Sequence, residues 1–257
     1  MEKDLVIIIP FINLPKYLLS LIDTICPKIS HEIILVDNGS NYETIERLKK
    51  LDNKEGVTKI RNKKNFGVGG AWNQGIKCAI KKYNPKYITI LNNDILLAEN
   101  CIGNMIKAIV KYDIPFVSGY DMAKECSMPE DILFMKSEGK EIIRDEPQFS
   151  CFTMKAEFLK QMREVETNIE KYPGRFDQDF FPAYFEDNDF HYRIKKMGTR
   201  AVSVNNALYF HFGSRTIKEQ EEISEHVNRT FLRNKHRFQK KWGGEPMKEK
   251  YKKPFNK

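Results

Sequence analysis

Apolar runs and helical patterns alternate along the first half of the chain. The apolar runs read as buried strands, because each ends at a polar or turn-forming residue; they cover residues 5–9, 32–37, 57–60, 87–91 and 116–118. Apolar residues recur at helical spacing in the intervals between them, over residues 15–25, 70–83 and 98–112. This alternation predicts an α/β chain with a mostly parallel, doubly wound, Rossmann-like sheet that helices cover on both faces.

Ligands of such sheets bind beyond the carboxyl ends of the parallel strands. That rule selects four polar or glycine-containing segments that directly follow predicted strands or open a helix. They are Pro10-Phe11, Asp37-Asn38-Gly39, residues 65–70 and Asn92-Asn93-Asp94. We therefore expect these segments to meet at one edge of the sheet.

The second half of the chain has a less regular pattern. Residues 120–148 are polar and give weak signals. Beyond them the pattern predicts a strand at 149–154, helices at 155–170 and 188–197, a loop at 171–175, and strands at 201–204 and 207–212. A dense acidic cluster, Glu186-Asp187-Asn188-Asp189, directly precedes and opens the second helix.

The charge is concentrated at the end of the chain. The net charge is +8, from 43 Lys and Arg against 35 Asp and Glu. Residues 212–257 alone hold 13 Lys and Arg against 6 Asp and Glu. A nearly neutral body makes nucleic acid an unlikely partner, although the basic tail leaves it open.

Cysteine usage and the first apolar run bear on the compartment. Five widely spaced cysteines form no C-x-x-C pair, so neither a disulfide framework nor a cysteine zinc site is indicated. The apolar run at residues 5–12 contains Pro10 and is too short to span a membrane. We expect a cytoplasmic protein, with peripheral membrane contact as an option.

Four segments together resemble glycosyltransferase family 2. They are residues 5–40, the stretch NFGVGGAWNQGI at 65–76, ITILNNDILL at 88–97, and FDQDFFPAYFEDNDFHYRIKKMG at 176–198 followed by HFGS at 211–214. The resemblance implies a GT-A catalytic domain over residues 1–215. Its nucleotide-sugar half would cover residues 1–118 and its acceptor half 119–215, leaving a basic helix and tail at 216–257. Asn-Asn-Asp at residues 92–94 is typical of the rhamnosyltransferase-like branch.

Donor contacts are expected near the strand ends. A carboxylate at Asp37 can accept hydrogen bonds from a nucleobase or ribose, as the matching family aspartate does, although Asp-Asn-Gly-Ser is also strong turn chemistry. The glycine-rich loop lets backbone approach a ligand, and the helix N-terminus after it favours an anion. Trp72 in that helix is interpreted as core packing. The expected donor-binding residues are Pro10, Phe11, Asp37, Asn65, Gly67, Asn73, Asn93, Asp94 and Arg193.

A divalent cation, Mn²⁺ or Mg²⁺, is implied by the family's DXD-like motif. By resemblance Asp94 is a ligand of that ion, and carboxylate and phosphate oxygens suit it. The strict first aspartate of the motif is missing here, so another ligand is wanted, and the resemblance makes His211 the candidate. The alternative for His211 is a histidine packed at the end of a strand.

Asp187 is the general base by its position in the family motif. It would take the proton of the acceptor hydroxyl as that oxygen attacks the anomeric carbon, and direct displacement inverts the configuration. Neighbouring Glu186 should raise the pKa of Asp187 towards the working range. The alternative for Asp187 is that the helix N-terminus carries acidic residues because they suit the helix dipole. The alternative to a diphosphate contact for Arg193 is an ion pair with Asp189.

The last apolar pattern predicts a basic amphipathic helix within residues 219–242. Its apolar stripe holds Ile223, Val227, Phe231, Phe238 and Trp242, and a basic stripe holds Arg229, Arg233, Arg237 and Lys240. Packing on the core with a solvated basic face is one interpretation. Contact with an anionic membrane surface or a polyanionic acceptor is the other.

The sequence thus predicts an inverting glycosyltransferase that uses a nucleotide-sugar donor. A UDP-sugar is the first choice of donor and a dTDP-sugar the second, and the acceptor is a glycan or a lipid-linked glycan. Two other functions fit the same residues. The chain could glycosylate modified bases of DNA, or it could be a binding protein that has lost turnover.

Overall fold

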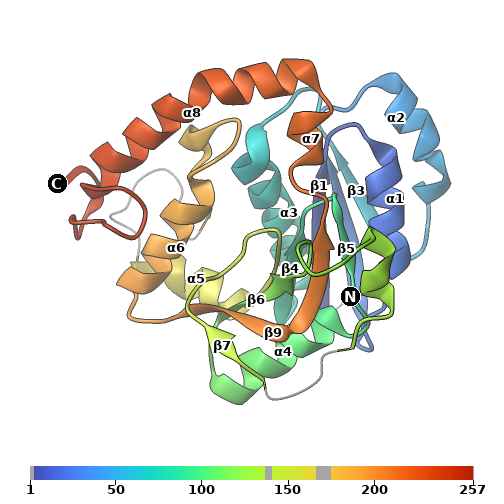
Figure 1. Ribbon diagram of the computed structural model, residues 1–257, viewed down its shortest axis with the longest axis horizontal. Helices are drawn as coiled ribbons and strands as arrows, with labels where there is room; N and C mark the ends of the chain where they lie inside the picture. The colour runs from blue at the N-terminus through green and yellow to red at the C-terminus, as the bar shows by residue number, and fades with distance from the viewer. Residues whose placement is uncertain (1–2, 137–140, 166–174, 257) are drawn as a thin grey trace.

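A single sheet runs through the computed structural model, which describes residues 3–136, 141–165 and 175–256 (Figure 1). Within these residues it has nine strands in the order β3-β2-β1-β4-β8-β6-β9-β5, with β7 paired to β9. The strands are β1 (Leu5–Phe11), β2 (His31–Asp37), β3 (Val57–Arg61), β4 (Tyr87–Leu91), β5 (Ile95–Leu97), β6 (Phe116–Asp121), β7 (Ile143–Arg144), β8 (Cys151–Lys155) and β9 (Ala201–His211).

The two halves of the sheet differ in strand direction. Strands β3, β2, β1 and β4 are all parallel to one another. Strand β8 is antiparallel to both β4 and β6, while β6 and β9 are parallel and β5 and β7 run antiparallel to β9. The carboxyl ends of β1, β2 and β4 therefore meet at one edge, as the alternating pattern predicts.

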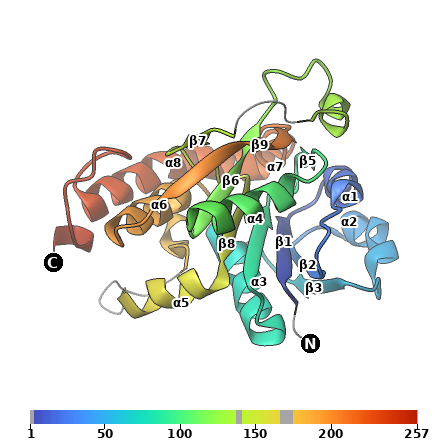
Figure 2. The ribbon, with the colours of Figure 1, turned by 90° about the horizontal axis from the view of Figure 1, so that it is seen from below.

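Helices cover both faces of this sheet (Figure 2). Helices α1 and α4 pack on one face and α3, α5 and α6 on the other. The helices are α1 (Pro15–Thr24), α2 (Tyr42–Arg47), α3 (Gly67–Tyr83), α4 (Cys101–Tyr112), α5 (Ala156–Val165), α6 (Glu186–Lys196), α7 (Arg215–Lys218) and α8 (Glu221–Trp242), with 3-10 turns η1 (Lys49–Leu51), η2 (Pro129–Leu133), η3 (Gln178–Phe180) and η4 (Pro254–Asn256). The predicted α/β architecture is confirmed.

Strand β1 is the centre of the core. Its side chains alternate between the two faces, so Leu5, Ile7 and Ile9 belong to one buried cluster and Val6 and Ile8 to the other. Helix α3 lies close against β1 at Gly75. A Cβ atom at this position would come within 2.3 Å of the Ile8 side chain. A strand buried on both faces explains the uninterrupted apolar run in the sequence.

Several predicted boundaries need correction in the second half. The two strands expected at 201–204 and 207–212 form the one long strand β9, and β5 has no counterpart in the prediction. The helix expected from residue 188 begins at Glu186, so Glu186 and Asp187 lie in its first turn. The helix expected over 155–170 is observed as α5 (Ala156–Val165), and residues 166–174 lie outside the described residues.

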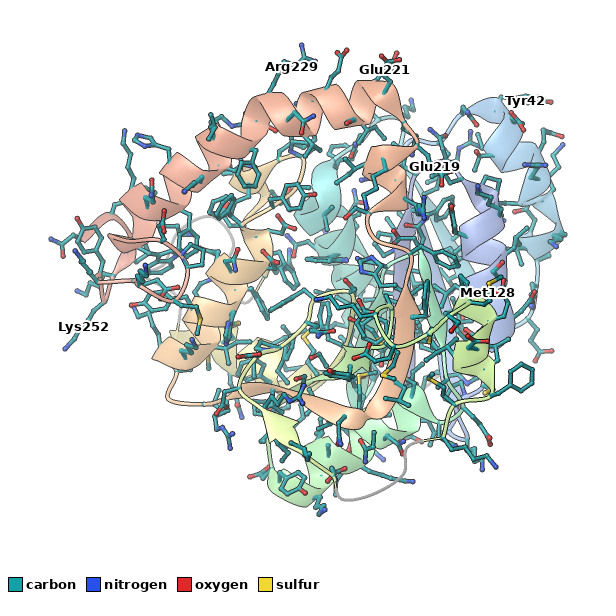
Figure 3. The ribbon with its side chains drawn as sticks, viewed as in Figure 1. Tyr42, Met128, Glu219, Glu221, Arg229 and Lys252 are labelled. Atoms are coloured by element: carbon teal, nitrogen blue, oxygen red, sulfur yellow. The ribbon has the colours of Figure 1, made fainter. Side chains whose placement is uncertain are left out.

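Helix α8 runs along the outside of the molecule, past α6 (Figure 1). Its apolar stripe packs inward, where Phe238 and Trp242 are fully buried with Phe180 and Phe185. Gly243 ends the helix in the left-handed region, at φ 75°, a conformation that glycine adopts readily. The side chains of Glu221 and Arg229 point outward from α8 (Figure 3). The interpretation of core packing is confirmed for this part of the stripe.

Candidate active site

A cavity of about 260 Å³ opens beyond the carboxyl ends of β1 and β4. It is closed on other sides by α3, the first turn of α6, α7 and the start of α8. Eight of the predicted site residues line it together: Pro10, Phe11, Asn65, Asn93, Asp94, Glu186, Asp187 and His211. Segments from both halves of the chain thus build one site.

Asparagine side chains fix the wall that follows β2. The Nδ2 of Asn38 donates to the Oδ1 of Asn65 at 2.8 Å, and the backbone N–H of Phe66 donates to the Oδ1 of Asn38 at 3.0 Å. The Oδ1 of Asn65 also accepts from the N–H of Gly67 at 2.7 Å. Asn38 lines the cavity but was not a predicted site residue. The carboxyl-end rule selected its segment, Asp37-Asn38-Gly39, but of these three residues only Asp37 was named as a donor contact.

Asp94 and His211 meet at one corner of the cavity. The antiparallel pairing of Ile95 with His211 across β5 and β9 brings them together, and His211 Nε2 lies 3.3 Å from Asp94 Oδ1. The other carboxylate oxygen accepts from the N–H of Arg215 at 2.8 Å. Burial alone would raise the pKa of Asp94, but the nearby His211 ring and the hydrogen bond from the Arg215 N–H lower it below its usual value.

This corner fits a divalent cation by its donor set. A carboxylate and an imidazole are both ligands of Mn²⁺, and diphosphate oxygens could complete the coordination. Among the described residues no third His, Cys, Asp or Glu joins the pair to form a closed metal cluster. A site of this kind needs oxygen ligands from the bound substrate.

Glu186 and Asp187 lie in the first turn of α6 and line the same cavity. Burial is the main cause that raises the pKa of both carboxyls, strongly for Glu186, where the charge of Asp187 adds to it. The raised pKa of Asp187 comes from burial and not from Glu186, which corrects the predicted cause. The Oε2 of Glu186 is buried and has no hydrogen-bond partner among the described atoms. Asp187 Oδ1 accepts from the N–H of Asn188 at 2.8 Å. A carboxyl with a raised pKa is suited to proton transfer.

Trp72 has a double role that its helical spacing did not reveal. It is 2% exposed and packs against Phe152 and Phe176, with ring centroids 4.6 Å apart in the second pair. The predicted core packing is therefore confirmed. The same ring lines the cavity, and its Nε1–H has no hydrogen-bond partner among the described atoms, so it is free to donate to a bound ligand.

Two predicted donor residues hold the protein together instead of lining the cavity. Asn73 exchanges two hydrogen bonds with the backbone of Phe176, at 2.8 and 3.0 Å. A Cβ at Gly67 would come 2.9 Å from the Phe181 ring and the Pro182 carbonyl. These contacts place both residues outside the cavity lining, and their role as donor contacts stays a prediction.

Arg193 also lies away from the cavity. Its Nε donates to Asp189 Oδ2 at 2.9 Å inside the protein, where its side chain is 2% exposed. The predicted diphosphate contact is corrected to the alternative ion pair. Asp37 is not among the residues that line the cavity, although its neighbour Asn38 is, and its Oδ1 accepts from the N–H of Ser40 at 2.8 Å. Its role in nucleotide binding stays a prediction.

Helix α8 contributes cations to a buried ion cluster next to the site. Lys241 Nζ lies 2.8 Å from both Asp177 Oδ2 and Asp189 Oδ1. Arg237 pairs with Asp177 at 3.3 Å and with Asp179 at 2.7 Å. The cluster ties α8 to α6 and to the loop before it. Arg237 was predicted on a solvated basic stripe, and its pairing with buried Asp177 corrects that prediction.

Asn234 of α8 holds the loop that forms one cavity wall. It is fully buried, and its Nδ2 donates to the carbonyls of Phe180 at 2.8 Å and Ala183 at 2.9 Å. Pro182, Ala183 and Tyr184 of this loop line the cavity. Sequence periodicity could not select Asn234, because polar residues at its spacing also occur on solvated helix faces.

Comparison with known proteins identifies the first half of the chain. Residues 6–130 match the sequence model of Glycosyl transferase family 2. The matched stretch is 125 of the 257 residues, just under half of the chain. The resemblance in the sequence is confirmed over these residues, and this family 2 segment contributes the strand-end residues and Asp94 to the cavity.

Two curated relatives match part of the chain at 31% identity. One is an uncharacterised protein of Methanocaldococcus jannaschii, aligned over 122 residues, 48% of this chain and 46% of its own length. The other is the glycosyltransferase GlyG of Streptococcus pneumoniae, aligned over 124 residues, 46% of this chain and 39% of its own length. The chain thus spans less than half the length of these relatives.

Solved structures share the fold over a larger part of the chain. One is the mannosyltransferase PcManGT of Pyrobaculum calidifontis in complex with GDP-Man and Mn²⁺. The superposition covers 90% of this chain and 65% of the PcManGT chain, with a TM-score of 0.57 and 15% sequence identity. The other is S. aureus TarS. Its superposition covers 90% of this chain and 72% of the TarS chain, again with a TM-score of 0.57 and 15% sequence identity. The predicted GT-A fold is confirmed.

Proposed function

We propose that this protein is a glycosyltransferase that moves a sugar from a nucleotide-sugar donor to a hydroxyl of a glycan or lipid-linked glycan. One observation carries the proposal. Asp94 and His211, suited to a cation, and Asp187, suited to a base, come from distant parts of the chain and line one cavity. Glycosyl transfer needs these two functions close to each other.

The donor is assigned to the side of the cavity formed by the family 2 segment. Pro10, Phe11, Asn65 and Asn93 are proposed to surround the nucleotide and its sugar, with Asp37 beside them. Asp94 and His211 would hold Mn²⁺ or Mg²⁺. When bound, the ion supplies charge neutralisation for the diphosphate that leaves.

Asp187 is proposed as the general base. Its carboxylate accepts the proton of the acceptor hydroxyl, that oxygen bonds to the anomeric carbon, and the bond from this carbon to the nucleoside diphosphate breaks. One displacement of this kind inverts the anomeric configuration. Help from a general base contributes roughly 10²–10⁴-fold in rate.

UDP is our first choice of donor nucleotide and dTDP our second. The second choice rests on Asn-Asn-Asp at residues 92–94, which is similar to the rhamnosyltransferase-like branch. GDP-sugars enter the test because the structural neighbour PcManGT was solved with GDP-Man and Mn²⁺.

Peripheral membrane contact through residues 219–242 is part of the proposal for a lipid-linked acceptor. No described helix is long and apolar enough to cross a membrane. Two cations of α8, Arg237 and Lys241, are committed to internal ion pairs. The exposed side chains of Arg229 and Lys240 are available for anionic headgroups.

The decisive experiment measures donor hydrolysis and transfer with UDP-, dTDP- and GDP-sugars, in Mn²⁺ and in EDTA. The proposal predicts turnover of at least one donor in Mn²⁺ and its loss in EDTA. Binding without turnover would favour the binding protein, and transfer to modified DNA with a steep salt dependence would favour the nucleic-acid acceptor. Full activity in EDTA would overturn the metal assignment.

A further inference from the structure

Two partly exposed aromatic rings lie at the edge of the cavity. Tyr184 lines the cavity and is 37% exposed, so it lies where the cavity meets solvent. Phe231 of α8 is 39% exposed and contacts it edge to face, with ring centroids 5.6 Å apart. Large apolar side chains left open beside a site are typical of ligand contact.

The apolar stripe of α8 runs outward from the cavity to Phe231. Ile223 and Val227 line the cavity, and Phe231 follows Val227 by one helical turn on the same face. The ring of Phe231 also lies 5.4 Å from that of Phe185. A continuous apolar surface therefore leads from the cavity to the solvent.

The loop that carries Tyr184 is held in an unfavourable conformation. Tyr184 and Phe185 both have positive φ, 72° and 78°, which bulky residues rarely adopt. The buried Asn234 side chain fixes the neighbouring carbonyls of Phe180 and Ala183. Strain that a fold stabilises in this way, beside a cavity, indicates a functional position for the side chain.

We propose that Tyr184 and Phe231 form an acceptor-binding platform for a neutral hexopyranoside; this inference rests on the proposed function. The acceptor hydroxyl must reach within hydrogen-bond distance of Asp187, three residues after Tyr184, so the rest of its ring lies at this edge of the cavity. The C–H face of a pyranose is apolar and carries partial positive charge. It packs well on an aromatic face, which is partially negative.

The test uses methyl α- and β-glycosides of glucose, galactose, mannose and N-acetylglucosamine as probes. Saturation-transfer NMR of the full chain should show contact with the C–H protons of one ring face for at least one probe. Phe231→Ala should weaken that binding roughly threefold to tenfold. Phe231→Tyr should keep it, since the ring remains.

Leu232→Ala is the matched control, because Leu232 is the next residue on α8 and is 72% exposed. It should leave probe binding and donor hydrolysis unchanged. Three results would overturn the platform. Phe231→Ala could bind the probe as well as the unaltered protein does, Leu232→Ala could lose as much probe affinity as Phe231→Ala, or no probe could bind at all. Donor hydrolysis by the unaltered protein distinguishes the two failures. If only the platform is wrong, the protein still hydrolyses the donor; if the proposed function is wrong, it does not.

Discussion

His211 Nε2 lies 3.3 Å from Asp94 Oδ1, although 116 positions separate the two residues in the chain. The pairing of β5 with β9 produces this contact, since Ile95 is in register with His211. The family resemblance predicts both as ligands of one ion. Their contact makes that assignment geometrically possible and gives it a direct test.

Asp94→Asn should raise the Mn²⁺ concentration that half-saturates donor hydrolysis by about a hundredfold, because the anionic ligand is lost while the shape is kept. Titration of activity with Mn²⁺ measures this. Asp113→Asn is the control, since Asp113 is exposed at the end of α4. An unchanged Mn²⁺ requirement in Asp94→Asn would refute Asp94 as a ligand.

Glu186 has a pH-dependent effect on stability that a neutral isostere should remove. Burial raises its pKa in the folded state, so its stabilising contribution is complete below the unfolded pKa of about 4.3 and is lost as the pH rises through the folded pKa. At a pH near the unfolded pKa of about 4.3, Glu186→Gln and the unaltered protein should have the same free energy of unfolding. Near pH 8 Glu186→Gln should be more stable by about 1–3 kcal/mol.

Denaturant unfolding at the two pH values checks this prediction. The difference between the variants, and not the absolute stability, is the quantity of interest, because other carboxyls titrate over the same range. If the difference were constant with pH, or reversed in sign, the buried carboxyl of Glu186 would not be neutral in the folded protein.

Lys241→Ala should destabilise the protein strongly. It leaves Asp177 and Asp189 buried without the cation that lies 2.8 Å from each. Asp177 keeps Arg237 and Asp189 keeps Arg193, so the cost should stay below the roughly 3–5 kcal/mol of a buried charge that loses its one partner. Lys240→Ala, at the exposed neighbouring position, should cost less than about 0.5 kcal/mol. Thermal unfolding of the two variants compares them, and equal melting temperatures would show that the cluster is not stabilising.

The strand-end residues could be predicted from the sequence, and the contacts of α8 could not. Uninterrupted apolar runs locate β1, β2 and β4, and the carboxyl-end rule then selects Asn93 and Asp94. Residue patterns along a helix, however, do not say which element the helix crosses. The contact of Asn234 with the Ala183 carbonyl depends on that crossing.

The glycines near residue 67 show a second limit of the sequence. A glycine-rich loop before a helix predicts close approach by something, but the pattern is the same for a phosphate and for another loop of the protein. Here the acceptor-half loop at Phe181 and Pro182 approaches Gly67. Only the fold distinguishes the two.

The most direct test of the account is sugar transfer by Asp187→Asn with the donor found in the hydrolysis screen. The variant keeps the shape of the side chain but cannot accept the proton at working pH. We predict that its affinity for the donor is unchanged and that its transfer rate falls by roughly 10²–10⁴-fold. Transfer at the rate of the unaltered protein would contradict Asp187 as the base and the assignment of this cavity as the site of glycosyl transfer.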